Sequence, residues 1–171
     1  MSTTFIRTGL LLAAALASAS CDAPTTTTSL EVTLTASPDP ALADASRGVT
    51  YQVTNADDTK TTYEYDWRTA FTVDIQETGG LAVDITSVNV KVQQASGGIV
   101  ITPSGGDVEY YRFNSSAGDN HIAANGSGAI GFEVYYDLPN KQKEALVTVS
   151  LTFEDDDGYT YGKSLAVKVA P

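Results

Sequence analysis

The chain has 171 residues, of which 42% are hydrophobic and 18% charged, enough apolar residues to bury the core of one domain. Its 10 Lys and Arg against 21 Asp and Glu give a net charge of -11 at pH 7. Such an acidic surface repels phosphate backbones and anionic lipid headgroups, so nucleic acid is excluded as an expected partner. The same charge is compatible with cation binding or with plain solubility.

The first twenty residues have the composition of an export signal. Residues 1–8 are polar with one positive charge at Arg7, and residues 9–17 (GLLLAAALA) form an apolar run. This run is shorter than the about 20 residues with which a helix spans a bilayer. Small residues follow at 18–20. The order of charge, short apolar core and small residues predicts a secretory signal peptide over residues 1–20.

Cys21 is the only cysteine and therefore forms no disulfide within the chain. With the residues before it, Cys21 resembles the lipobox of bacterial lipoproteins, in which a branched apolar residue and two small residues precede the cysteine. The resemblance implies that Ala19 and Ser20 precede cleavage and that Cys21 becomes the lipidated N-terminus. Ser18 stands where Leu is usual, with Leu16 two residues earlier. The alternative is ordinary cleavage after Ala19, which leaves Cys21 as a free thiol.

Residues 21–29 (CDAPTTTTS) have the composition of a short tether. One proline, four threonines and no large apolar side chain favour an extended, solvated segment. The lipoprotein resemblance implies that acyl groups such as palmitate on the cysteine hold the domain firmly at a membrane. The expected location is the bacterial cell envelope, with the domain facing the periplasm or the cell surface.

From residue 30 onward apolar and polar residues alternate, which is typical of half-buried β-strands. The strongest alternation lies in residues 62–76 (TYEYDWRTAFTVDIQ), which predict one long strand with room for a bend midway. The alternation changes phase at Ser87, which predicts a β-bulge or a change of sheet. Shorter strands are predicted around 30–34, 49–53, 81–92, 98–102, 130–136, 147–153 and 161–169, with turns at 38–40, 55–60 and 77–80.

About eight strands with short turns predict an all-β fold over residues 30–171, a single antiparallel β-sandwich. The segment FEVYYDLPNKQKEALVTVSLTFEDDDGYTYGKSLAVKVA resembles the last strands of immunoglobulin-like (Ig-like) and fibronectin type III-like domains. The shared pattern is Leu138 and Pro139 at a crossover, an acidic turn and a last alternating strand. There is no cysteine pair to bridge two sheets, and Ala145 stands where a fibronectin-like domain has its corner tyrosine. Because such domains serve as spacers, adhesion modules and accessory subunits, the resemblance assigns no single function.

The sequence predicts a non-catalytic protein without a cofactor. His121 is the only histidine and lies in SSAGDNHIAANGSG, a stretch of loop composition. Ser115, Ser116 and Asp119 are close to it in sequence, but adjacency in a loop does not make a nucleophile–base pair. No spacing typical of paired catalytic carboxylates is present elsewhere.

An acidic run at Asp155, Asp156 and Asp157, followed by Gly158, is the best metal candidate, since calcium favours clustered carboxylates beside a glycine. The spacing of an EF-hand fails because Phe153, a core residue of the predicted strand, occupies its first ligand position. Asp and Gly also suit a plain hairpin turn. A calcium-stabilised adhesion domain at the cell surface is therefore the alternative to the main prediction.

The longest irregular region is 94–128, and binding sites concentrate in long loops on rigid scaffolds. It contains EYYRF, in which Tyr110, Tyr111 and Arg112 offer aromatic surface and a charged donor. The alternative is a short strand that buries Tyr111 and Phe113. The sequence thus predicts a membrane-anchored lipoprotein serving as a binding or structural module, with an unidentified protein or glycan as partner.

Overall fold

The computed structural model describes residues 29–95 and 120–171, together with the backbone of 109–113. Within these residues the fold is all-β, as the sequence predicts, with one short 3-10 turn, η1 (Pro139–Lys141). The strands are β1 (Val32–Ser37), β2 (Ala41–Ala45), β3 (Thr50–Thr54), β4 (Lys60–Glu64), β5 (Trp67–Glu77), β6 (Val83–Gln94), β7 (Glu109–Phe113), β8 (His121–Ile122), β9 (Ser127–Tyr136), β10 (Ala145–Asp155) and β11 (Thr160–Ala170).

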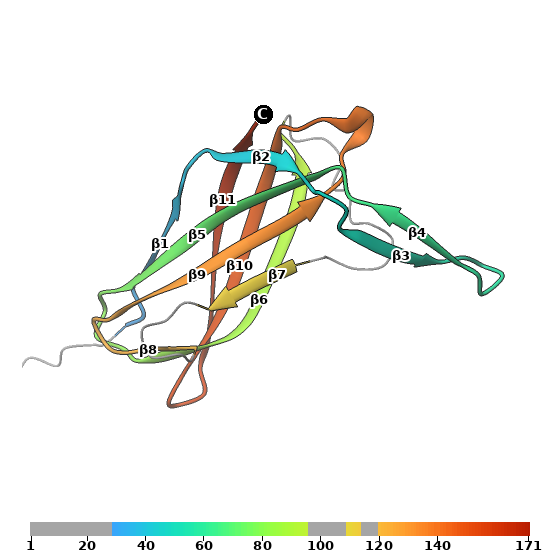
Figure 1. The fold of residues 1–171 in the computed structure, drawn as a ribbon. Coiled ribbons are helices and arrows are strands. Elements are labelled where there is room, and N and C mark those ends of the chain that lie inside the picture. Colours follow the sequence, from blue (N-terminus) through green and yellow to red (C-terminus); the bar gives the residue numbers. More distant parts are fainter. Residues whose placement is uncertain (1–28, 96–108, 114–119) are drawn as a thin grey trace, which may run out of the picture.

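Nine of these strands form one curled sheet whose two halves face each other as layers (Figure 1). One layer contains β1, β5, β9 and β7, and the other contains β11, β10, β6 and β8. β2 joins them, pairing antiparallel with β5 through residues 43–45 and parallel with β11 through Ala41 and Leu42. The sheet is therefore mixed, which corrects the expectation of a purely antiparallel fold. The parallel pair arises because β2 leaves the first layer and meets the last strand running in the same direction.

The core lies between the two layers, where strands of one layer cross those of the other (Figure 1). On β5 every second residue points inward, and Phe71, Val73 and Ile75 are fully or almost fully buried. Phe71 stacks on Phe132 of β9 with ring centroids 5.3 Å apart. The five apolar inward positions of β10 are buried, and burial of such apolar area is the main driving force for folding. These positions are Ala145, Val147, Val149, Leu151 and Phe153.

A β-bulge interrupts the pairing of β6 with β10. Thr152 is paired with Ser87, whereas the next residue of β10, Phe153, is paired with Ile85. Thr86 is therefore the extra residue, and the inward face of β6 continues in the opposite phase on the other side of it. The bulge confirms the irregularity that the change of phase at Ser87 predicts.

Residues 32–77 form one long antiparallel ribbon, whose two ends belong to the layers and whose middle, β3 and β4, does not. β1 and β2 run along β5, and β3 continues along β4 as a separate two-stranded sheet. This β3–β4 hairpin projects from the body, on the right of Figure 1, and turns within the predicted segment 55–60. The ribbon is interrupted at Tyr65 and Asp66, so the long strand predicted over 62–76 is divided into β4 and β5. An isolated hairpin is marginally stable, so contacts at its base matter.

The far end of β5 is closed by a buried carboxylate. Glu77 is 0% exposed, and its oxygens accept the backbone N–H groups of Gly79 (2.7 Å), Gly80 (3.1 Å) and Asn125 (2.7 Å). Burial raises the pKa of Glu77, but these N–H donors outweigh it and the net shift is downward. Gly79 has no room for a side chain, because a Cβ there would overlap the carbonyl oxygen of Ser29.

The crossover from β9 to β10 is fixed by a tyrosine hydroxyl. Tyr136, buried at the end of β9, donates a hydrogen bond of 2.6 Å to the backbone carbonyl of Lys143. Burial raises the pKa of Tyr136. Leu138 is buried beneath the crossover and Pro139 begins η1, so the predicted crossover at Leu138 and Pro139 is confirmed.

Candidate functional site

Four tyrosine rings stack at the base of the β3–β4 hairpin. Tyr63 of β4 lies directly opposite Tyr51 of β3, and their ring centroids are 5.5 Å apart at an interplanar angle of 25°. Tyr51 also packs on Tyr65 at 4.5 Å, and Tyr65 reaches Tyr135 of β9 at 6.1 Å. We call these four residues the tyrosine ladder. It links the projecting hairpin to the body through aromatic contacts.

The inner and outer rings of the tyrosine ladder differ in exposure. Tyr65 is 1% exposed, whereas Tyr63, at the outer end, is 47% exposed. Tyr51, on which Tyr63 stacks, is itself packed on Tyr65. Tyr63 therefore offers a flat apolar surface on a ring that is already held in place. An aromatic surface fixed in this way loses little conformational entropy when a ligand covers it.

Asp137 joins the hairpin to the end of β9. Its Oδ1 accepts the backbone N–H of Asp66 at 2.6 Å, and its Oδ2 lies 3.4 Å from the hydroxyl of Tyr51. Burial raises the pKa of Asp137, and this rise exceeds the effect of the hydrogen bonds that lower it. Lys141 Nζ lies 3.1 Å from Asp66 Oδ1, so the carboxylate of Asp66 is paired as well.

The other end of the tyrosine ladder meets a group of paired charges. Glu133 Oε1 accepts hydrogen bonds from Arg68 Nη1 at 2.9 Å and from the hydroxyl of Tyr135 at 2.7 Å. Arg68 Nη2 lies 3.7 Å from Asp44 Oδ2. The hydrogen bond to Glu133 is the main cause that raises the pKa values of both Arg68 and Tyr135. Glu133 and Asp44 therefore share the guanidinium of Arg68 as their cationic partner.

The predicted binding segment of residues 109–113 runs beside these paired charges. It forms β7, which pairs with β9 and places Tyr110 opposite Glu133, Tyr111 opposite Phe132 and Arg112 opposite Gly131. The alternative of a short strand is thus confirmed for the backbone. A role of Tyr110, Tyr111 and Arg112 in binding stays a prediction, now placed next to the tyrosine ladder.

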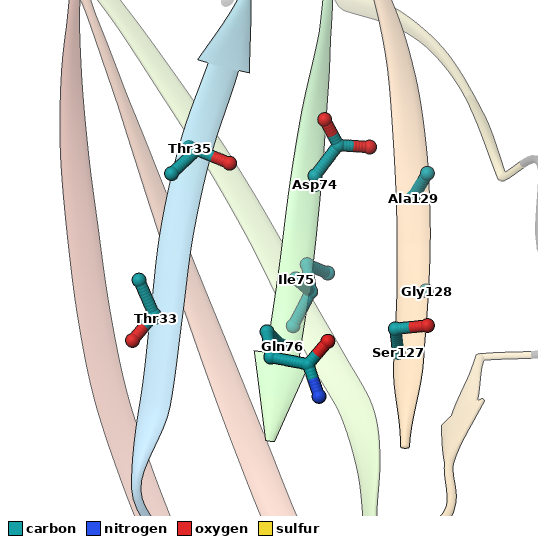
Figure 2. Close-up of a pocket in the computed structure, with 8 residues that line it drawn as sticks. All are labelled: Thr33, Thr35, Asp74, Ile75, Gln76, Ser127, Gly128 and Ala129. Carbon is teal, nitrogen blue, oxygen red and sulfur yellow. The ribbon is translucent and has the colours of Figure 1, made fainter. Parts of the chain in front are cut away.

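A shallow groove of about 440 Å³ lies on the outward side of β1, β5 and β9. Figure 2 shows hydroxyl, carboxamide and carboxylate groups along it, at Thr33, Thr35, Asp74, Gln76 and Ser127. Asp74 has no ion-pair partner within the described part of the chain. Because alternate residues of a strand share a face, Asp74 and Gln76 lie on the same outward face of β5 as Arg68.

The acidic run 154–157 forms the turn between β10 and β11. Asp155 Oδ1 accepts the backbone N–H groups of Asp157 (3.0 Å) and Tyr159 (2.9 Å), and its Oδ2 accepts the hydroxyl of Tyr161 (2.7 Å). The bond from Tyr161 is the main cause that lowers the pKa of Asp155. Asp156 and Asp157 are exposed. Both oxygens of Asp155 thus serve the turn, as the hairpin interpretation of this run predicts.

Calcium binding by Asp155, Asp156 and Asp157 stays a prediction. Among the residues that the structure describes, no group of three or more Asp, Glu, His or Cys side chains is placed to hold a metal ion. In the same part of the chain, no helix is long and apolar enough to cross a membrane.

His121 lies in β8 rather than in a loop, which corrects the expectation from its composition. Its Nδ1 is 2.9 Å from Asp84 Oδ1 of β6, its partner in the register. Ser115, Ser116 and Asp119 are outside the described residues, and so is Cys21 with the predicted signal peptide.

The sequence prediction missed the tyrosine ladder. The alternation assigned Tyr63 and Tyr65 to the buried face of one long strand, and Tyr51 to a strand of its own. A usable signal was present, because a hairpin that turns within 55–60 brings residues on either side of the turn face to face. Continuing that pairing outward from the turn leads to Tyr51 and Tyr63.

No family model matches the chain, and no curated protein matches it. Among solved structures, the chain is similar to the X-ray structure of Northeast Structural Genomics Consortium target SoR45. The two are 12% identical with a TM-score of 0.43, over 83% of this chain and 87% of that chain. At these values the similarity carries no argument about fold or function.

Proposed function

We propose that the chain is an exported bacterial lipoprotein, anchored through Cys21, whose β-sandwich is a non-catalytic binding module of the cell envelope. The observation that carries the binding role is the tyrosine ladder. A spacer needs no stacked tyrosines that end in a half-exposed ring on a projecting hairpin, and such preordered aromatic surface is typical of binding sites.

The strand order supports an Ig-like sandwich for this module. One layer has the order β1-β5-β9-β7 and the other β11-β10-β6, as in the ABED and GFC sheets of an Ig constant-type domain. β2 then corresponds to the part of the first strand that leaves its own sheet and pairs with the last strand of the other sheet. The hydroxyl of Tyr136 holds the crossover of the chain between layers, which is the task of a corner tyrosine in such domains.

The position of the N-terminal segment is compatible with a lipid anchor. Ser29 is close to Gly79, at the Glu77 end of β5, whereas the tyrosine ladder lies beyond the Trp67 end. A strand of this length spans about 33 Å at 3.3 Å per residue. A domain anchored through Cys21 would therefore hold the ladder on the side away from the tether.

The anchor is tested by the intact mass of the protein purified from its native membrane fraction. The expected mass is that of residues 21–171 with a diacylglyceryl group on Cys21. A mass that corresponds to residues 20–171 without lipid would contradict the anchor and leave a free thiol.

The binding role is tested with the mature chain, residues 21–171, carrying Cys21→Ser so that it remains unlipidated. A fluorescent label on this protein should bind to washed envelope fragments of the producing cell. Tyr63→Ala should reduce binding, and Tyr159→Ala should not, because Tyr159 is 67% exposed at the β10–β11 turn, away from the tyrosine ladder. Equal binding of both variants would overturn a binding role of the ladder.

A further inference from the structure

We infer that the tyrosine ladder and the groove are two parts of one track for an extended, uncharged polysaccharide, with a sugar ring stacked on Tyr63. This inference rests on the proposed binding function and specifies the class of its ligand. Two described features carry it: the half-exposed ring at the end of the ladder and the hydroxyl-lined groove on the outward side of β1, β5 and β9.

The exposed ring favours a ligand with a flat face of C–H groups. The face of a tyrosine ring carries partial negative charge, which attracts the partly positive C–H groups on one side of a pyranose ring. Tyr51 supports Tyr63 from behind at 5.5 Å, so the ring is held in place before the ligand arrives. A stacked sugar gains this contact without first ordering the side chain.

The charges beside the tyrosine ladder are paired within the protein, which favours an uncharged ligand at that end of the track. Glu133 is engaged by Arg68 and Tyr135, and Asp66 is engaged by Lys141. A cationic ligand would therefore compete with existing partners for each of these carboxylates. An anionic ligand is disfavoured by the net charge of -11. Hydroxyl groups of a sugar can donate to the remaining lone pairs of these carboxylates without displacing their partners.

The groove favours a hydroxyl-rich chain rather than a single small ring. Its polar groups are hydroxyls of Thr33, Thr35 and Ser127, the carboxamide of Gln76 and the carboxylate of Asp74 (Figure 2). The two oxygens of a carboxylate can accept two adjacent sugar hydroxyls at once. Gln76 lies in the groove and Arg68 lies beside the tyrosine ladder, about 26 Å apart along β5 at 3.3 Å per residue, so only an extended chain reaches from the groove to the ladder.

The inference is tested by affinity electrophoresis of the mature Cys21→Ser protein in native gels. The gels contain soluble neutral polysaccharides, namely a β-glucan, a mannan, a xylan and a galactan, or the acidic polygalacturonate. At least one neutral polysaccharide should retard the protein, and polygalacturonate should not. Tyr63→Ala should weaken the retarding interaction about tenfold and Asp74→Ala several-fold, while Tyr159→Ala should leave it unchanged. Tyr63→Trp, which keeps a ring for stacking, should restore it.

Failure of the inference is distinct from failure of the proposed function. No retardation by any of the neutral polysaccharides, or retardation by the acidic one alone, would overturn the inference that the ligand is an uncharged glycan. If Tyr63-dependent binding to envelope fragments persisted, the binding role would stand with another class of ligand. Normal retardation of Asp74→Ala would overturn the track that joins the ladder to the groove.

Discussion

The carboxylate of Glu77 accepts the backbone N–H of Asn125 at 2.7 Å, which ties the end of β5 to the loop that precedes β9. The same carboxylate accepts two N–H groups from the turn after β5, so one buried side chain fixes two loops. The buried carboxylate stabilises the fold only while it is ionised and its N–H donors are in place.

Glu77→Gln should destabilise the fold by about 2 kcal/mol, because the carboxamide replaces one acceptor oxygen with a donor facing backbone N–H groups. The folded-state pKa of Glu77 is lowered, so its contribution is present above the unfolded-state pKa and is lost as pH falls through the folded value. Urea unfolding at about pH 7 and about pH 3 measures both effects. The native protein should lose more stability on acidification than the variant does. Parallel losses would show that Glu77 does not carry this pH dependence.

Tyr136→Phe should lower stability by about 1 kcal/mol, because it removes the hydrogen bond that the buried Tyr136 donates to the backbone carbonyl of Lys143. This corresponds to a fall in the melting temperature of about 3 °C for a domain of this size. Tyr159→Phe is the control, since its hydroxyl is at an exposed turn. Thermal melting followed by circular dichroism measures the difference. An unchanged melting temperature for Tyr136→Phe would show that the hydroxyl does not stabilise the crossover.

Asp155→Ala should lower the melting temperature, because three donors of the β10–β11 turn lose their acceptor. Asp156→Ala, at the exposed neighbouring position, should have little effect. Addition of millimolar calcium should leave the melting temperature of the native protein unchanged, since the oxygens of Asp155 already accept hydrogen bonds from the turn. A calcium-dependent rise that Asp155→Ala abolishes would instead support the calcium-stabilised adhesion domain.

Gly128→Ala should destabilise the fold by about 1 kcal/mol, because the terminal Cδ1 of the buried Ile122 must shift to make room for a Cβ at this position. Ile122→Val removes that methyl group, so the double variant should lose less stability than the two single losses added together. A double-mutant cycle by urea unfolding measures this coupling. Additive losses would show that Ile122 does not set the need for glycine at 128.

Regular alternation made the large strands predictable from sequence, whereas short or interrupted elements were not. Residues 147–153 alternate strictly and form most of the buried strand β10. β2 was missed because its sequence, ALADA, has only small apolar residues apart from Leu42, which is exposed. The sequence allows a bend midway in 62–76, but it does not place the interruption at Tyr65 and Asp66, because the alternation continues through them.

The candidate site was less predictable than the fold because its contacts join residues far apart in sequence. Asp137 binds the backbone of Asp66, and Glu133 binds Arg68, through pairings that only the sheet topology brings about. Composition drew attention to the tyrosines of 109–113, whose strand does lie next to this network. It gave no reason to connect them with Tyr51, which is placed by the turn of another hairpin.

The antiparallel alignment of β1 with β5 determines how the protein would respond to a mechanical pull. All six residues of β1 are paired with β5, and β1 is the first strand after the proposed anchor at Cys21. If a ligand bound to the β3–β4 hairpin held the cell in place, the domain would be under tension between the tether and the hairpin. This tension would act along the axis of β1. The bonds between β1 and β5 would then be strained together in shear instead of opening one after another, so the first strand would resist detachment of the domain under tension.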